Sequence, residues 1–204
     1  MIPLRVDGPE RALEAVVLAH GAGAPMDSPF LEYVAAGLAT RGLRVVRFEF
    51  PYMDARRDGR RPPPDREPVL LDRWRAVIAE LGGRPLVIGG KSLGGRMASL
   101  LADEVGARGL VCLGYPFHPP GKPQRLRVAH LESLRTPTLV VQGTRDALGS
   151  REEVAGYRLS RSIRVHWIED GDHSLKPRAR SGRSERQNLD EAVDAVAQFV
   201  SALD

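Results

Sequence analysis

Ser92 stands between two glycines in the segment Leu86–Ala98, in the pattern Gly90-x-Ser92-x-Gly94. An apolar run precedes the pattern and residues with helical spacing follow it, which is the strand-turn-helix context of a nucleophilic serine. The turn is so tight that its flanking positions need glycine, and it lifts the serine hydroxyl above a sheet at the start of a helix. The free N–H groups there stabilise developing negative charge. We therefore predict a nucleophilic role for Ser92 over a purely structural glycine turn.

A second glycine-rich loop follows the apolar run Val16–Ala19. It consists of His20, Gly21, Ala22 and Gly23. With the serine pattern, this loop makes the chain resemble a small α/β-hydrolase from the first apolar run to the last helix. The chain is most similar to the dienelactone-hydrolase-like group, and within it to the small testis-expressed and chromatin-complex-associated branch. Dienelactone hydrolases proper carry a cysteine nucleophile, so their particular reaction is not expected of a chain with Ser92.

The resemblance implies an oxyanion hole, which is a pair of backbone N–H groups that hold the substrate oxygen. The N–H of Ala22 or Gly23 would join that of Leu93, because small side chains let the backbone approach the substrate closely. A glycine turn with a structural histidine is the alternative for the first loop. The other motif residues are expected to support the loop and the turn: His20, Gly21, Gly90 and Gly94.

A serine nucleophile needs a base and an acid, and in this family they follow it in the order Asp or Glu, then His. His166 falls inside an apolar run and is expected to be structural, whereas His173 directly follows that run and is the predicted base. No carboxylate occurs between Leu113 and Glu132, while Asp146 follows the next run at the family's usual position and is the predicted acid. The other nearby carboxylates are expected at a helix start or in turns: Glu152, Glu153, Asp170 and Asp172.

Six short apolar runs are predicted to be strands, most of them parallel strands covered on both faces, while the last alternates more and is expected nearer an edge. They are Ala15–Ala19, Leu43–Phe48, Pro85–Ile88, Gly109–Leu113, Thr138–Val141 and Ile163–Ile168. Helical spacing of apolar residues predicts helices over Phe30–Thr40, Val69–Leu81, Leu93–Val105 and Gln187–Leu203. With the resemblance, this alternation predicts a three-layer α/β-hydrolase fold. Its sheet is mostly parallel, with about six to seven strands and helices on both faces, and it forms a single domain over residues 1–204 without a lid domain.

Polar and proline-rich segments are predicted to be connections. They are Met53–Pro68, Tyr115–Pro137 with a short helical piece around Leu126–Leu134, and Ser174–Glu185. His118 and His130 lie in the second connection and are expected at the surface. The basic stretches Arg56–Arg66 and Lys176–Arg186 both follow carboxyl ends of predicted strands, so we expect them to rim one pocket and to favour anionic substrates. A solvated arginine-rich surface is the alternative.

The composition indicates a soluble globular domain. The 204 residues are 42% hydrophobic and 27% charged, and 30 basic against 26 acidic residues give a net charge of +4. A charge this small does not by itself indicate nucleic-acid binding. Cys112 is the only cysteine and is expected to be a buried small hydrophobe, which excludes an internal disulfide. No secretory signal and no run of about 18 apolar residues is present, so a cytoplasmic location without membrane contact is expected.

These patterns predict a serine hydrolase, similar to carboxylesterases or thioesterases, that cleaves small soluble acyl esters through Ser92, His173 and Asp146. The alternative is a catalytically weak hydrolase-like interaction protein, since the resembled branch includes members found in assemblies. The residues show no zinc-like spacing, and Gly89–Gly95 lacks the spacing of a phosphate-binding loop, so neither a metal ion nor a cofactor is expected. The expected partner is a small acyl substrate and not a nucleic acid, and both a monomer and a homodimer stay open.

Overall fold

The computed structural model describes residues 2–12, 15–82 and 86–203. In these residues one seven-stranded sheet has the order β1-β3-β2-β4-β5-β6-β7. The strands are β1 (Leu4–Asp7), β2 (Ala15–Ala19), β3 (Arg44–Phe48), β4 (Leu86–Lys91), β5 (Gly109–Leu113), β6 (Thr138–Gly143) and β7 (Ile163–Ile168). All neighbours pair in parallel except β1, which is antiparallel to β3. The predicted mostly parallel sheet is confirmed.

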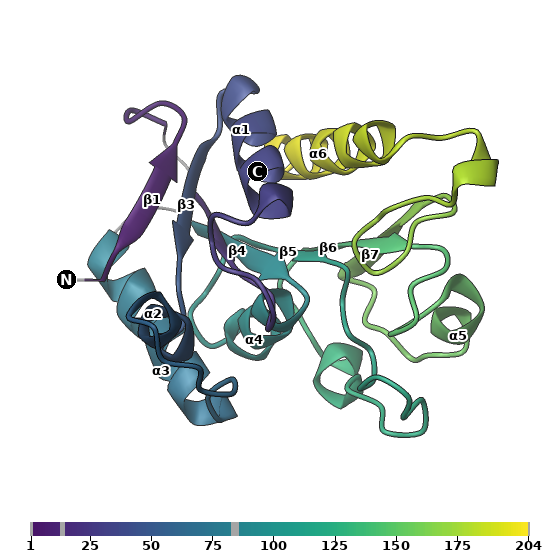
Figure 1. The fold of residues 1–204 in the computed structure, drawn as a ribbon, viewed down its shortest axis with the longest axis horizontal. Coiled ribbons are helices and arrows are strands. Elements are labelled where there is room, and N and C mark those ends of the chain that lie inside the picture. Colours follow the sequence, from purple (N-terminus) through teal and green to yellow (C-terminus); the bar gives the residue numbers. More distant parts are fainter. Residues whose placement is uncertain (1, 13–14, 83–85, 204) are drawn as a thin grey trace.

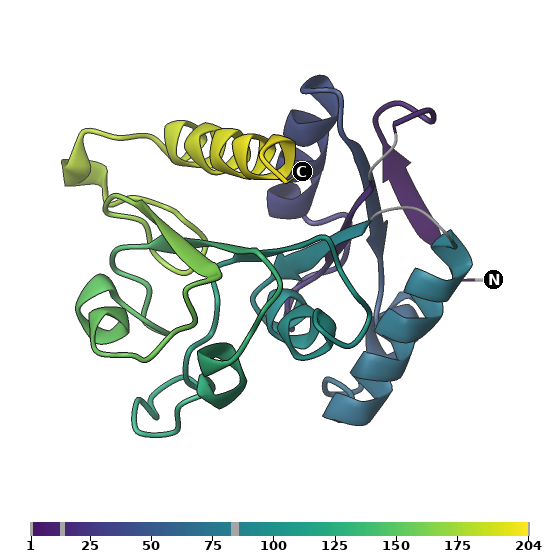
Figure 2. The same ribbon diagram turned by 180° about the vertical axis from the view of Figure 1, so that it is seen from behind.

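Helices cover both faces of the sheet, which gives three layers (Figure 1). Helices α1 (Pro29–Thr40) and α6 (Glu185–Ser201) lie on one face. The other face carries α2 (Pro51–Arg57), α3 (Glu67–Leu81), α4 (Leu93–Leu101) and α5 (Arg151–Ala155). Short 3-10 helices occupy Ala129–Glu132 and Ala179–Ser181. Seen from behind, the same two layers flank the sheet, and the described residues hold no separate lid domain (Figure 2).

The core explains why the strands are apolar at nearly every position. β2 is buried along its whole length, and its side chains alternate between two clusters. Val16 packs with residues of α1 and α6, whereas Val17 packs with residues of α3 and α4, including the fully buried Trp74. A strand covered on both faces has no solvent-facing position, and the usual alternation of polar and apolar residues is therefore lost.

The structure corrects several predicted boundaries near the start of the chain. β1 was not expected, because it is a four-residue edge strand whose middle residues are exposed. The segment Met53–Pro68 is not one connection, since α2 covers its first five residues and α3 its last two. Helix α2 was hidden in the sequence because it buries only Tyr52 and Met53 and carries three charged residues, Asp54, Arg56 and Arg57. Pro85, the expected start of β4, lies outside the described residues.

Later boundaries shift by a few residues. Helix α4 ends at Leu101 and not at Val105, and the chain continues through turns to Gly106, whose φ is +60°. The expected helical piece around Leu126–Leu134 is reduced to the 3-10 helix at Ala129–Glu132. Helix α6 begins two residues earlier than predicted because Ser184 and Gln187 form a capping box. No helix among the described residues combines the length and apolar character that membrane crossing requires.

Candidate active site

Ser92 sits in a strained turn between β4 and α4. Its φ of 49° and ψ of −110° lie in a region that residues with a side chain rarely adopt, at a cost of about 1–3 kcal/mol. The glycines on either side allow this turn to pack against β2. An added Cβ would lie 2.2 Å from the carbonyl oxygen of Ala19 at Gly90 and 2.4 Å from it at Gly94. Close packing of the turn onto the neighbouring strand therefore requires both glycines.

The parallel sheet gathers the predicted residues at one edge. His20 follows β2, Ser92 follows β4, Asp146 lies beyond β6 and His173 lies beyond β7. Because parallel strands end at the same edge, the loops that follow them meet there. Residues separated by up to 153 positions in the sequence are thus brought to one end of the molecule.

Ser92, His173 and Asp146 form a continuous chain of hydrogen bonds. The Nε2 of His173 lies 2.9 Å from the Oγ of Ser92, and its Nδ1 lies 2.8 Å from the Oδ2 of Asp146. Asp146 is fully buried, whereas about a third of the His173 side chain is exposed, at 29%. A buried carboxylate that accepts from Nδ1–H leaves Nε2 free to take the serine proton. The arrangement can carry out nucleophilic acyl transfer.

Gln142 orients the carboxylate and was not anticipated from the sequence. It is fully buried at the end of β6, and its Nε2 donates to the Oδ2 of Asp146 at 2.8 Å. The backbone of Tyr115 holds the amide in place, since its N–H donates to Oε1 at 2.7 Å and its carbonyl accepts from Nε2 at 3.2 Å. The N–H of Leu148 donates to the other carboxylate oxygen, also at 2.8 Å. In the sequence, the feature that could have indicated this role is a polar residue near the end of an otherwise apolar strand.

The expected oxyanion-hole residues line the pocket in front of Ser92. Ala22 and Gly23 come from the loop after β2, and Leu93 is the first residue of α4. Within the part of the chain that the structure describes, none of their backbone N–H groups has a hydrogen-bond partner. Unpaired N–H groups beside a nucleophile can receive a negatively charged oxygen. The N–H of Leu93 together with that of Ala22 or Gly23 stays the predicted donor pair.

His20 supports the first loop from inside. It is fully buried, its Nδ1 lies 2.7 Å from the carbonyl oxygen of Gly21, and its Nε2 accepts the N–H of Phe50 at 3.1 Å. These contacts assign the proton to Nδ1, and burial lowers the pKa of the ring. Tyr52 adds a second anchor, because its hydroxyl donates to the carbonyl oxygen of Ala22 at 3.1 Å. His20 thus holds the loop as a neutral ring.

Lys91 is a further residue of the site that the sequence analysis did not single out. Its Nζ donates to the carbonyl oxygen of His173 at 2.6 Å and lies 5.5 Å from the centre of the Phe30 ring. Burial lowers its pKa to about 8, an effect that the Asp146 charge opposes. The ammonium ties the segment that carries His173 to the serine turn. In the sequence, the feature that could have indicated a role for Lys91 is a charged residue next to Ser92 at the end of an otherwise apolar run.

A cavity of about 690 Å³ opens in front of Ser92. Its apolar lining includes Phe30, Leu93 and Leu148, and its polar lining includes Lys91, His173 and Arg127. The pocket therefore offers an apolar surface for an acyl or leaving group, with the Ser92 hydroxyl at its wall.

The expectation that two basic stretches rim this pocket is wrong. Of Arg56–Arg66 only Pro64 lines it, and within the described chain no residue of Lys176–Arg186 does. Several of their arginines have carboxylate partners instead: Arg57 pairs with Glu49 and Asp27, Arg178 with Asp170, and Arg183 with Glu191. Ion pairing to nearby carboxylates, which the sequence pattern does not reveal, decides where these side chains lie.

The sequence profile of the alpha/beta hydrolase domain family matches residues 12–201. The chain belongs to this α/β-hydrolase family. Solved structures agree with the fold. A lidless α/β serine hydrolase from Xanthomonas campestris has a TM-score of 0.71 at 20% identity, covering 97% of this chain and 87% of its own. Est1E from Butyrivibrio proteoclasticus, solved with ferulic acid bound, has a TM-score of 0.74 at 15% identity, covering 99% and 95%. These comparisons confirm the α/β-hydrolase fold of this chain.

A third solved structure is more similar in sequence. It is a member of the α/β superfamily from Xanthomonas campestris pv. campestris, with 26% identity and a TM-score of 0.62. The alignment covers 93% of this chain and 99% of that chain.

Two of the three remaining histidines of the hydrolase, His118 and His130, differ from their expected surface settings. His118 is buried and not at the surface, and its Nε2 lies 3.4 Å from Glu153. His130 is half-buried, with Nε2 2.8 Å from the hydroxyl oxygen of Ser99. His166 lies in β7 beside Glu191 at 3.1 Å, away from the serine pocket, as its structural assignment predicts.

Cys112 behaves as a buried hydrophobe in this hydrolase. It lies in β5, is 1% exposed, and burial raises the pKa of its thiol, so the thiolate that a nucleophile requires is disfavoured. Among the described residues, no three His, Cys, Asp or Glu side chains gather in a way that could hold a metal ion.

Proposed function

We propose that this α/β-hydrolase is a serine esterase that cleaves small acyl esters or thioesters through a covalent acyl-enzyme. The observation that carries the proposal is the hydrogen-bonded chain from Ser92 through His173 to Asp146 at the wall of an open cavity. Because the described residues hold no lid domain over the pocket, short and soluble substrates fit better than long lipids. The motifs around His20 and Ser92 also support a place in the dienelactone-hydrolase-like branch.

The first half-reaction forms the acyl-enzyme. Nε2 of His173 takes the proton from the Ser92 hydroxyl while Oγ attacks the substrate carbonyl carbon. The carbonyl oxygen becomes an oxyanion, which the N–H of Leu93 and one N–H of the Ala22–Gly23 loop hold. Asp146 stabilises the imidazolium that forms on His173. Collapse of the intermediate expels the alkoxide or thiolate, which leaves with the proton from Nε2.

The second half-reaction releases the acid. Nε2 of His173 takes a proton from water, whose oxygen attacks the acyl carbon, and the same N–H groups hold the second oxyanion. When this intermediate collapses, Oγ of Ser92 regains the proton from Nε2, and the carboxylic acid departs. The enzyme returns to its initial state without a cofactor.

The single-domain organisation, the cytoplasmic location and the oligomeric state stay predictions.

Covalent labelling with a fluorophosphonate tests the proposal. We expect the wild-type protein and a Ser201→Ala control, which changes an exposed serine of α6, to label equally. The Ser92→Ala variant is expected to lose the label and to lose hydrolysis of 4-nitrophenyl butyrate. If wild-type protein does not label, or if Ser92→Ala labels as fast, the esterase proposal is wrong and the interaction-protein alternative takes its place.

A further inference from the structure

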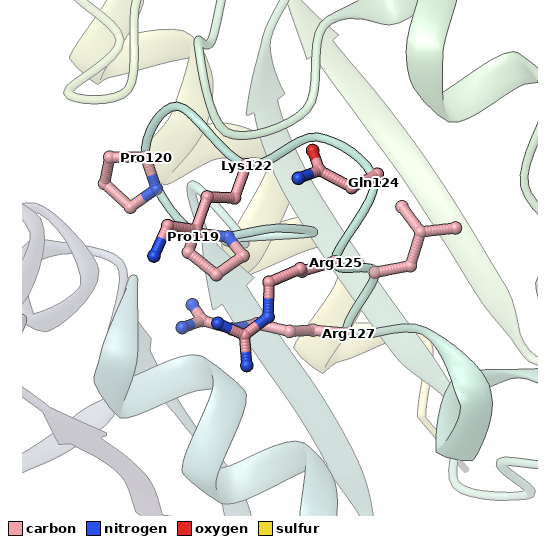
Figure 3. Close-up of a pocket in the computed structure, with 7 residues that line it drawn as sticks. Pro119, Pro120, Lys122, Gln124, Arg125 and Arg127 are labelled. Atoms are coloured by element: carbon pink, nitrogen blue, oxygen red, sulfur yellow. The ribbon is translucent and has the colours of Figure 1, made fainter.

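A second, strongly basic pocket lies in the connection between β5 and the first 3-10 helix. It has a volume of about 770 Å³, and its lining includes Pro119, Pro120, Lys122, Gln124, Arg125 and Arg127 (Figure 3). In this view the two guanidinium groups and the Lys122 ammonium extend to the same side of the loop. Three cationic groups and one amide thus face a common space.

The basic pocket adjoins the pocket in front of Ser92. Pro120 and Arg127 line both cavities, so a molecule held at Ser92 can extend past these two residues into the basic pocket. The backbone of Arg127 is anchored on both sides. Its N–H donates to the carbonyl oxygen of Phe117 at 2.7 Å, and its carbonyl accepts the Tyr115 hydroxyl at 3.1 Å. These bonds fix the backbone of Arg127 between the two cavities, and its side chain extends from this fixed point.

The cations of this pocket differ from most others on the surface in having no carboxylate partner. Within the described residues, no Asp or Glu lies at ion-pair distance from Lys122, Arg125 or Arg127, whereas Arg57 and Arg178 each bind carboxylates. Burial lowers the pKa of Arg127, and the nearby charges of Arg96 and Arg125 lower it further. Grouped cations repel one another, so a bound anion would relieve an unfavourable arrangement.

The chemistry of the pocket favours an oxyanion. A guanidinium presents several N–H donors in a planar fork that matches the oxygens of a carboxylate or a phosphate. Two prolines in the lining restrict the backbone, so less conformational freedom is lost when a ligand binds.

We propose that the preferred substrates of Ser92 carry an oxyanion, a carboxylate or a phosphate, which Arg127 and Arg125 bind in the neighbouring basic pocket. The inference rests on the proposed esterase function and names its substrate class. Anion selectivity then comes from the loop Pro119–Arg127 and not from the two arginine-rich stretches Arg56–Arg66 and Lys176–Arg186. Arg127 acts at the junction of the cavities, and Arg125 and Lys122 add positive charge further out.

Matched esters that differ only in charge test the inference. One set compares 3-acetoxybenzoate and 3-acetoxyphenyl phosphate with the neutral 3-acetoxybenzamide, which places the anion on the leaving group. A second set compares the half-ester mono-4-nitrophenyl adipate with its neutral methyl ester, which places the anion on the acyl group. We expect kcat/KM for at least one anionic ester to exceed that of its neutral match by about tenfold, the effect of one charge-assisted hydrogen bond. The preference should shrink between about 0.01 M and about 1 M salt.

Variants separate the basic pocket from general charge effects. Arg127→Gln and Arg125→Gln should each lower the ratio of anionic to neutral kcat/KM severalfold. Arg158→Gln removes the same charge from a side chain that is 89% exposed outside both pockets, and should keep the wild-type ratio. A ratio near one in the wild type, or an unchanged ratio in both pocket variants, overturns the inference alone. If no probe is hydrolysed by the wild type, the esterase proposal fails and the inference fails with it.

Discussion

The Asp146→Asn substitution tests the proposed role of the buried carboxylate, because the two carboxylate oxygens have different partners. Oδ2 lies 2.8 Å from the Nδ1 of His173 and accepts the Nε2 of Gln142, also at 2.8 Å, while Oδ1 accepts the N–H of Leu148 at 2.8 Å. An asparagine must place its NH₂ group on one side or the other. Facing Leu148 costs one hydrogen bond, whereas facing His173 and Gln142 costs two, so we expect the NH₂ group to face Leu148.

This orientation decides the size of the effect. The oxygen of the asparagine still accepts from His173, so the proton stays on Nδ1 and Nε2 stays free. The loss is then the negative charge opposite the imidazolium. At about 4 Å and an effective dielectric constant of about 20, that charge is worth roughly 4 kcal/mol. We therefore expect kcat to fall about 10³-fold. The unpaired Leu148 N–H lowers the free energy of unfolding by about 1–3 kcal/mol.

The assay is steady-state hydrolysis of 4-nitrophenyl butyrate together with urea unfolding. Asp170→Asn is the matched control, since Asp170 is also a largely buried aspartate that pairs with Arg145 and Arg178 but lies outside the hydrogen-bonded chain. It should lose stability and keep kcat within a few-fold of wild type. A fall in kcat of less than about tenfold for Asp146→Asn, or an equal fall for Asp170→Asn, contradicts the proposed role of the Asp146 charge.

Three other substitutions test the support of the site. Gln142→Met removes the acceptor of the Tyr115 N–H. Steady-state kinetics should show a fall in kcat of about tenfold with little change in KM, and urea unfolding should show a loss of about 1–3 kcal/mol in the free energy of unfolding. Burial lowers the pKa of His130 to about 4, so the unfolded chain takes up a proton first and stability falls as pH drops from about 6.5 to about 4. His130→Gln should flatten that fall in urea unfolding, and an unchanged slope contradicts it. Gly94→Ala places a methyl group 2.4 Å from a backbone oxygen of β2, and thermal unfolding should show a loss of stability of about 1–3 kcal/mol. Gly156→Ala is the control, because its methyl group lies 3.4 Å from the nearest atom and should cause a smaller loss.

Much of the fold was predictable because its signals are local. The runs at β2, β5 and β7 matched the observed strands at both ends. β2 and β5 are buried along their whole length, which demands apolar residues without interruption. β7 is a partly exposed edge strand that keeps an alternating apolar pattern. Helix α2 was missed because a short helix that buries two residues leaves a polar sequence. Edge strand β1 was missed for the same reason, since half-exposed residues carry little hydrophobic pattern.

The candidate site was predictable where residue type and position along the chain both matter. Ser92 is marked by its glycines, and His173 and Asp146 are marked by their places after strands, because a parallel sheet brings such places together. Gln142 and Lys91 were not singled out, since their roles depend on groups far away in the sequence. Lys91 reaches the carbonyl of His173, and Gln142 reaches the backbone of Tyr115.

Local patterns of burial and backbone conformation in the sequence predict a parallel α/β sheet and place a serine, a histidine and an aspartate so that they meet at its edge. The distribution of charge around the pocket depends instead on contacts between residues that are distant in the sequence. In the stretches Arg56–Arg66 and Lys176–Arg186, the side chains of Arg57, Arg178 and Arg183 pair with nearby carboxylates. Arg125 and Arg127 lie beside the site, and neither has a carboxylate partner within the described chain. A long charged side chain pairs with whichever opposite charge lies near it in space, and the order of residues in the sequence does not show which one that is.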